Sequence, residues 1–111
     1  MPLDILLMMD GEVFRKEKGY WVKIEAKRVQ ASRERPQGIS YSITLHDRNN
    51  TRILGYDNAH AMKTKKKGYG ARKVTWDHVH RIDVVTPYEY ESAAKLLEDF
   101  WNEANAIMGL K

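Results

Sequence analysis

The sequence contains no cysteine among its 111 residues, which excludes disulfide bonds and zinc sites built on thiolates. It also has no apolar run close to the roughly 20 residues that a membrane-spanning helix needs. The first residues, Met1-Pro2-Leu3-Asp4-Ile5, lack the positively charged stretch that begins a secretory signal peptide. These absences favour a protein of the reducing cytoplasm that has no membrane partner.

Several motifs of well-known enzymes and DNA-binding proteins are missing too. There is no glycine-rich phosphate loop, no nucleophile elbow and no helix-turn-helix pair. With 42% hydrophobic and 31% charged residues, the chain has the composition of an ordinary globular protein, and it is long enough to bury a core. We therefore predict one domain over residues 1–111.

Acidic residues are absent from residues 62–75, although the net charge of the whole chain is only +4. The six cations in this stretch are Lys63, Lys65, Lys66, Lys67, Arg72 and Lys73. Local positive charge favours a polyanionic partner such as RNA, so we predict that these side chains contact nucleic acid. The alternative is a solvated loop whose charges only maintain solubility.

Alternating apolar and polar residues predict the strands. In residues 20–27 and 39–46 nearly every second residue is apolar, as in a half-buried antiparallel strand. Further strands are expected at residues 51–56 and 76–85. The apolar run 5–9, which ends at Asp10-Gly11, is predicted to begin a hairpin.

A long amphipathic helix is expected at the C-terminal end. Thr86-Pro87-Tyr88-Glu89 has the pattern of a capping box with proline in the first turn, and Gly109 is a typical residue after a helix. Apolar residues from Ala93 to Met108 recur every three or four positions and form one stripe. The expected fold class is α+β, an antiparallel meander sheet of five to six strands with this helix of about 22 residues packed across it.

Two clusters of polar residues flank the basic stretch. The first is Tyr56-Asp57-Asn58-Ala59-His60, and the second is Asp77-His78-Val79-His80-Arg81. Residues i and i+2 of a strand point to the same face. His78 and His80 can therefore converge on one ligand, while Val79 points to the other face. This pair is the strongest indication of a functional site in the sequence.

In the first of three interpretations, the clusters cleave RNA. Imidazole titrates near neutral pH, so one histidine can remove the proton of a 2′-hydroxyl group and another can protonate the leaving oxygen. Cationic side chains would stabilise the charge that develops on the phosphate, and Asp77 would hold a histidine tautomer. The predicted catalytic residues are His78, His80, Asp57 and Asp77, and the predicted nucleic-acid contacts are Arg81, Asn58 and the six cations of residues 62–75.

In the second interpretation, a divalent metal ion binds His60, His78, His80 and Asp57, because imidazole and carboxylate ligands suit zinc, manganese or iron. Apart from such an ion, we expect no cofactor. In the third interpretation the clusters are structural. Asp57 and Asn58 then form a turn, and the histidines bond to neighbouring main-chain groups.

Four motifs follow one another in the second half of the chain. They are Tyr56-Asp57-Asn58, Asp77-His78-Val79-His80, Pro87-Tyr88-Glu89-Tyr90 and Leu97-Glu98-Asp99-Phe100-Trp101. In this order they resemble the TumE-like toxin family of prokaryotic toxin–antitoxin systems, over residues 53–105. The resemblance implies a growth-inhibiting toxin with a cognate antitoxin protein as its partner. It also points to Asp57, Asn58, Asp77, His78 and His80 as the polar cluster of the family, although the long basic insertion departs from the family's pattern.

We therefore predict a toxin that acts on RNA, as an endoribonuclease with a His-x-His/Asp site and a basic loop. One alternative is a domain without catalytic activity that binds nucleic acid or protein. Another is a metal-binding hydrolase that uses the same histidines and aspartate. The expected partners are the antitoxin, RNA and a second copy of the chain in a homodimer.

Overall fold

The structure, a computed structural model, describes residues 2–33, 35–58, 77–82 and 84–109. The predicted metal ligand His60 lies outside the described residues. So do the six predicted nucleic-acid contacts of the basic stretch, Lys63, Lys65, Lys66, Lys67, Arg72 and Lys73.

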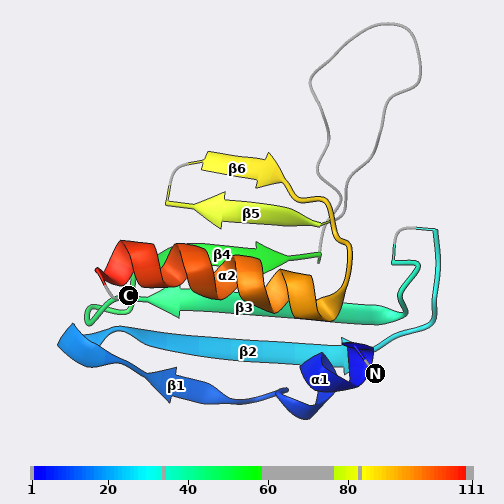
Figure 1. Cartoon of the computed structure of the whole chain (residues 1–111), viewed down its shortest axis with the longest axis horizontal. Helices are drawn as coiled ribbons and strands as arrows, with labels where there is room; N and C mark the ends of the chain where they lie inside the picture. Colours follow the sequence, from blue (N-terminus) through cyan, green and yellow to red (C-terminus); the bar gives the residue numbers. More distant parts are fainter. Residues whose placement is uncertain (1, 34, 59–76, 83, 110–111) are drawn as a thin grey trace, which may run out of the picture.

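One sheet contains the six strands of the described residues, in the order in which they occur in the chain (Figure 1). Every neighbouring pair is antiparallel, which confirms the predicted meander. The strands are β1 (Val13–Arg15), β2 (Trp21–Arg28), β3 (Ile39–His46), β4 (Arg52–Asp57), β5 (His78–Arg81) and β6 (Val84–Pro87). A 3-10 turn, η1 (Glu17–Gly19), joins β1 to β2.

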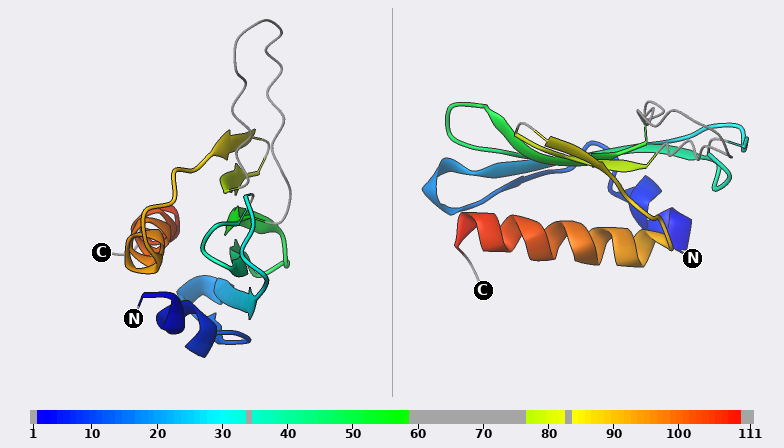
Figure 2. Two further views of the ribbon diagram at one scale, coloured as in Figure 1. Left: turned by 90° about the vertical axis from the view of Figure 1, so that its right-hand side faces the viewer. Right: turned by 90° about the horizontal axis from the view of Figure 1, so that it is seen from above.

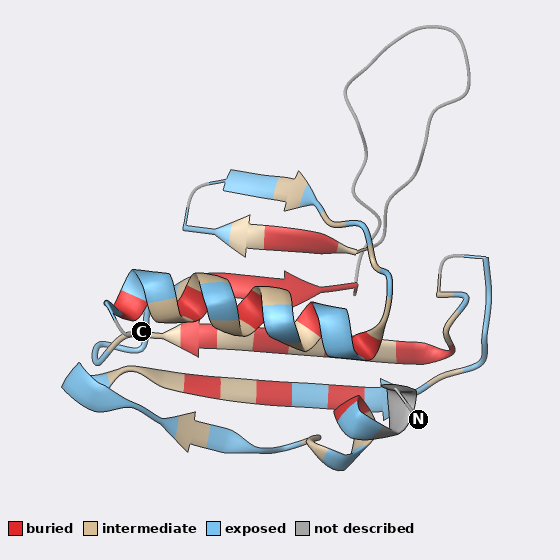
Figure 3. Cartoon of the chain, viewed as in Figure 1, coloured by how far each residue is buried: buried red, intermediate tan, exposed pale blue. Residues whose placement is uncertain are grey.

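Two helices, α1 (Pro2–Met8) and α2 (Ala93–Met108), lie on one side of the sheet (Figure 2). We call the sheet face toward α2 the helix face and the opposite face the distal face. Buried residues alternate with more exposed ones along β2 and β3, as the sequence pattern predicts (Figure 3). The buried set points to the helix face and packs against the buried stripe of α2, which includes Leu96 and Phe100. Burial of each such side chain stabilises the fold by roughly 1.5–3 kcal/mol.

The N-cap of α2 lies six residues after Thr86, where the sequence placed it. This N-cap is Ser92, whose hydroxyl accepts a hydrogen bond from the Lys95 main-chain N–H. Thr86 instead belongs to β6 and pairs with Val79. A Thr-Pro pair with a later glutamate is compatible with an edge strand as well as with a helix start, and pairing to β5 decides between them. At the other end, Gly109 has the expected left-handed conformation, with φ of 78°.

Two predicted strands were wrong. The apolar run 5–9 lies mostly in the helix α1, whose Leu6 is completely buried in the core. Periodicity cannot separate a helix from a strand in so short an apolar run. The single strand predicted for residues 76–85 is a hairpin, β5 and β6, and its turn shifts the face on which later residues lie. Val85 therefore lies on the same face as His80. In a single continuous strand, Val84 would lie on that face instead.

Replacing Ser92 by alanine should lower the free energy of unfolding by about 1 kcal/mol, because the Lys95 N–H loses its acceptor. Chemical denaturation followed by circular dichroism measures this loss. Thr86→Val is the comparison, since it removes the hydroxyl at the cap position that the sequence suggested. This variant loses only an exposed hydrogen bond from Arg81 Nη1, so it should lower stability by less than Ser92→Ala does. A larger loss for Thr86→Val than for Ser92→Ala would contradict the observed start of α2.

Candidate functional site

The register of β4 and β5 determines which side chains share the distal face. Tyr56 points to the helix face, where its hydroxyl donates a hydrogen bond of 2.9 Å to Glu103 of α2. Its neighbour Asp57 therefore points to the distal face. Asp57 lies directly opposite His78, and Gly55 lies opposite His80. The side chains of Asp57, His78 and His80 thus lie together, and Val79 points into the core as predicted.

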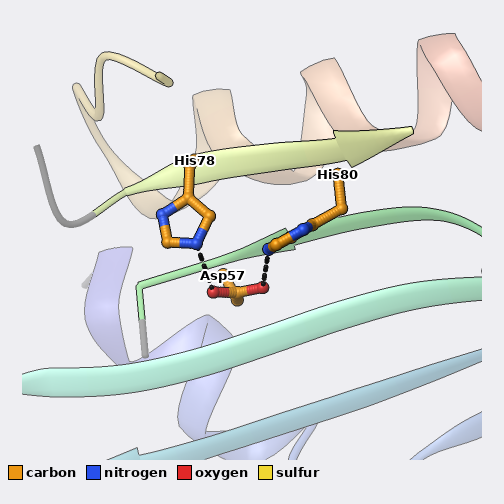
Figure 4. A group of neighbouring side chains, drawn as sticks. All are labelled: Asp57, His78 and His80. Atoms are coloured by element: carbon orange, nitrogen blue, oxygen red, sulfur yellow. Dashed lines mark ion pairs between the residues drawn. The ribbon is translucent and has the colours of Figure 1, made fainter. Parts of the chain in front are cut away.

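The carboxylate of Asp57 lies between the two imidazoles (Figure 4). Its Oδ1 is 3.2 Å from His78 Nε2, and its Oδ2 is 3.0 Å from His80 Nε2. The two rings are 4.7 Å apart between centroids and inclined at 69°. An ionised carboxylate can only accept hydrogen bonds, so both Nε2 atoms carry the proton in this arrangement. Asp57 therefore selects the same tautomer in both histidines.

The two histidines differ in their access to solvent. The side chain of His78 is 4% exposed, whereas that of His80 is 23% exposed. Among the described residues, no partner lies within hydrogen-bond distance of His78 Nδ1. A substrate can therefore reach His80 more easily than His78. The buried His78 contacts Asp57 Oδ1 and helps to hold the carboxylate in position.

The surroundings of His80 favour its neutral form. Burial is the largest cause that lowers the pKa of His80, and the positive charge of Arg52 lowers it further, while Asp57 acts in the opposite direction. The pKa of His80 therefore lies below its ordinary value, and the imidazole is mainly neutral at pH 7. A neutral imidazole can act as a base or as a metal ligand.

Asp77 lies apart from this group. Its Oδ2 accepts a hydrogen bond of 2.7 Å from the hydroxyl of Tyr41, a residue of the helix face. Burial raises the pKa of Asp77, and the hydrogen bond from Tyr41 opposes that change. Asp57, rather than Asp77, is the carboxylate that contacts the imidazoles. We therefore propose that Asp57, in place of Asp77, holds the tautomers of the two histidines.

Asn58 is completely buried and bonded to the main chain of β3. Its Oδ1 accepts from the Tyr41 N–H at 3.0 Å, and its Nδ2 donates to the Ile39 carbonyl at 2.9 Å. The main-chain carbonyl of Asn58 accepts from Arg35 Nε at 3.0 Å. We therefore propose a structural role for Asn58, which holds the end of β4 against β3, in place of the predicted contact with nucleic acid.

Arg81 points to the helix face, away from the imidazole pair. Its guanidinium binds both carboxylate oxygens of Glu103, with Nη2 3.1 Å from Oε1. Its Nη1 also donates to Thr86 Oγ1 at 3.1 Å. This arginine joins β5 to α2 and to β6, so its predicted contact with nucleic acid would lie on the side opposite to the histidines. An apolar hollow lies next to it on this side, lined by Ile53, Ile82, Val84 and Ile107 together with Arg81 and Glu103.

The group of Asp57, His78 and His80 also has the composition of a metal site. One ligand atom of each residue lies within 4.8 Å of the others. Two imidazoles and one carboxylate are a common ligand set for zinc and for non-haem iron, and they leave coordination positions open for a substrate. The fourth predicted ligand, His60, is not among the described residues.

Sequence reasoning missed Arg35 and Tyr41, which hold Asn58 and Asp77 in place. Arg35 belongs to the connection between β2 and β3, and its bond to Asn58 joins residues 23 positions apart in the chain. Tyr41 was identified only as an apolar strand residue. No local pattern in the sequence indicates either contact, because each depends on how β3 and β4 meet.

These features define a small α+β protein that carries a histidine–carboxylate group on the distal face of a six-stranded antiparallel sheet. The family model described as Toxin TumE matches residues 10–108. The match covers most of the chain, so this protein belongs to the TumE toxin family, which confirms the resemblance seen in the motifs. No curated protein and no solved structure gives a match. None of the described helices is long and apolar enough to cross a membrane.

Asn58→Ala should lower the free energy of unfolding by about 2–4 kcal/mol, because Ile39 C=O and Tyr41 N–H would both lose a buried partner. Denaturant titration measures the change. Asn102→Ala is the matched control, since Asn102 is exposed on α2, where alanine favours the helix. Equal stability of the two variants would show that the buried amide does not hold β4 against β3.

Proposed function

We propose that this toxin acts on RNA and that His80, oriented by Asp57, is its reactive group. The proposal is supported chiefly by the contact of one carboxylate with two imidazoles, of which one is partly accessible to solvent. In this arrangement a histidine can exchange a proton with a substrate while a fixed anion holds its tautomer. Membership of a toxin family agrees with a damaging activity of this kind.

The proposed reaction is cleavage by the neighbouring 2′-hydroxyl group. Neutral His80 removes the proton from the 2′-hydroxyl, and the oxygen attacks the adjacent phosphorus atom. The bond between phosphorus and the 5′ oxygen then breaks, and that oxygen takes a proton from solvent. A 2′,3′-cyclic phosphate remains on one product. The carboxylate of Asp57 stabilises the positive charge that His80 gains, and His78 keeps the carboxylate in position.

The toxin family also implies an antitoxin as partner, and we propose that this protein binds one. The six cations of residues 62–75 remain predicted contacts for RNA. Their side chains would add the positive charge that attracts a polyanion to the site. The homodimer stays a prediction.

His80→Ala should abolish growth inhibition on induced expression and should slow cleavage of RNA by about 100-fold or more, because the base is lost. His46→Ala is the control. His46 lies on the same sheet face but does not contact Asp57. Its imidazole bonds to Thr44 and stacks on Trp21. Growth curves and gel analysis of RNA with purified proteins measure the two effects. If His80→Ala remains as toxic as the wild type at equal protein level, catalysis by His80 is wrong.

A metal-dependent hydrolase is the second candidate, and the convergence of the three ligand atoms favours it. A divalent cation bound by Asp57, His78 and His80 would lower the pKa of a bound water molecule and polarise a phosphate oxygen. The residues fit such an ion because both Nε2 atoms already point to the same carboxylate. The neutral state favoured for His80 is also the state that binds a metal.

Under this second candidate, purified wild-type protein dialysed against Zn²⁺ or Mn²⁺ should retain about one ion per chain. Asp57→Ala and His80→Ala should each lose it, whereas His46→Ala should keep it. Elemental analysis by mass spectrometry measures the metal content. Equal metal content in the wild type and in Asp57→Ala would exclude a metal at this site, and RNA cleavage that survives a chelator would favour the acid–base reaction.

A further inference from the structure

A β-bulge in β4 changes the face on which Arg52 lies. Leu45 pairs with Leu54, but the next residue of β3, His46, pairs with Arg52, so Ile53 is the extra residue. Leu54 is completely buried in the core, on the helix face. In a regular strand, Arg52 would share that face, because it lies two positions from Leu54. The bulge instead places Arg52 opposite His46, on the distal face.

On this face the side chain of Arg52 extends over Gly55. A Cβ atom added to Gly55 would lie 3.5 Å from Arg52 Cδ, 3.7 Å from Arg52 Nε and 3.4 Å from Thr44 Cγ2. Gly55 is in turn the direct partner of His80 across β4 and β5. Because Gly55 has no side chain, Arg52 can occupy the space above it, next to His80 on the neighbouring strand. The effect of the Arg52 charge on the pKa of His80 agrees with this proximity.

Arg52 has no anionic partner among the described residues. Its side chain is exposed, and no described carboxylate lies within ion-pair distance of it. Three other cations of the sheet are paired: Lys23 with Glu25, Lys27 with Asp10 and Arg81 with Glu103. The guanidinium of Arg52 is therefore available to an anion at the edge of the imidazole group.

We propose that Arg52 forms an oxyanion site over Gly55, beside His80, and that its ligand is a phosphate group. The planar guanidinium can donate two parallel hydrogen bonds to phosphate oxygens. Neutral His80 gives its only ring proton to Asp57, so it lies beside the phosphate as a base and not as a hydrogen-bond donor. The negative charge of Asp57 opposes this binding, and the contacts from the two imidazoles offset it only in part, so the attraction for the phosphate comes from the charge of Arg52. The identity of the phosphate as part of RNA rests on the proposed function. The site itself rests on the geometry.

Nuclear magnetic resonance titrations with two probes test the site, and the probes separate the two sources of phosphate. One probe is inorganic phosphate, and the other is a short RNA whose 2′-O-methyl groups prevent cleavage. Arg52→Ala should weaken binding of the 2′-O-methyl RNA by about tenfold or more, and Arg52→Lys should restore part of the affinity. Arg28→Ala is the matched control, since it removes the same charge from an exposed residue at the end of β2 and should change affinity less than about twofold.

The outcomes separate this site from the proposed function. The site is overturned if the wild type binds neither probe, or if Arg52→Ala and Arg28→Ala weaken binding equally. If Arg52→Ala alone weakens binding but His80→Ala cleaves RNA as well as the wild type, the phosphate site stands and catalysis by His80 fails. If inorganic phosphate binds through Arg52 and the RNA does not, the ligand is a free phosphate. An unchanged thermal midpoint in Arg52→Ala confirms that the fold is intact.

Discussion

The contact of the Asp57 carboxylate with two imidazoles depends on the register between β4 and β5. Asp57 and His78 are opposite one another because the next pair, Tyr56 and Val79, is anchored in the core beneath α2. A slip of one residue would turn both histidines toward α2 and bring Val79 to the distal face. The apolar face of the sheet therefore fixes the geometry of the polar face, although no core residue takes part in the proposed chemistry.

The two faces of the sheet divide the polar residues of the motifs into two groups. On the helix face, Arg81 bonds to Glu103 and Tyr41 bonds to Asp77, and these contacts join the sheet to α2 or to the start of β5. On the distal face, His80 and Arg52 keep polar atoms within reach of a ligand. Neighbouring residues in one motif thus have different roles because alternate strand residues point in opposite directions. This division places the structural residues of a motif and the residues that we propose to be functional on opposite faces of the sheet.

The spacing of residues within one segment predicted the features that depend on that segment alone. The alternation in β2 and β3 indicated their buried face, and the spacing of His78 and His80 placed both on one side of β5. Contacts between distant segments could not be predicted in this way. Thr86-Pro87 has the pattern of a helix start, and only its pairing with β5 shows that it belongs to a strand. Asp77 is next to His78 in the sequence, whereas Asp57 is distant in the sequence and reaches the histidines only through the pairing of β4 with β5. The bulge at Ile53 has no glycine to mark it, so the face of Arg52 followed only from the pairing with His46.

The tautomer of each imidazole in metal-free protein tests the central contact most directly. Long-range ¹H–¹⁵N correlation spectra distinguish a proton on Nε2 from one on Nδ1. With Asp57 as acceptor, His78 and His80 should both carry the proton on Nε2 when neutral, and the Asp57→Ala variant should lose this preference in His80. A proton on Nδ1 of His80 in the wild type, or identical spectra of its imidazole in both proteins, would contradict the account.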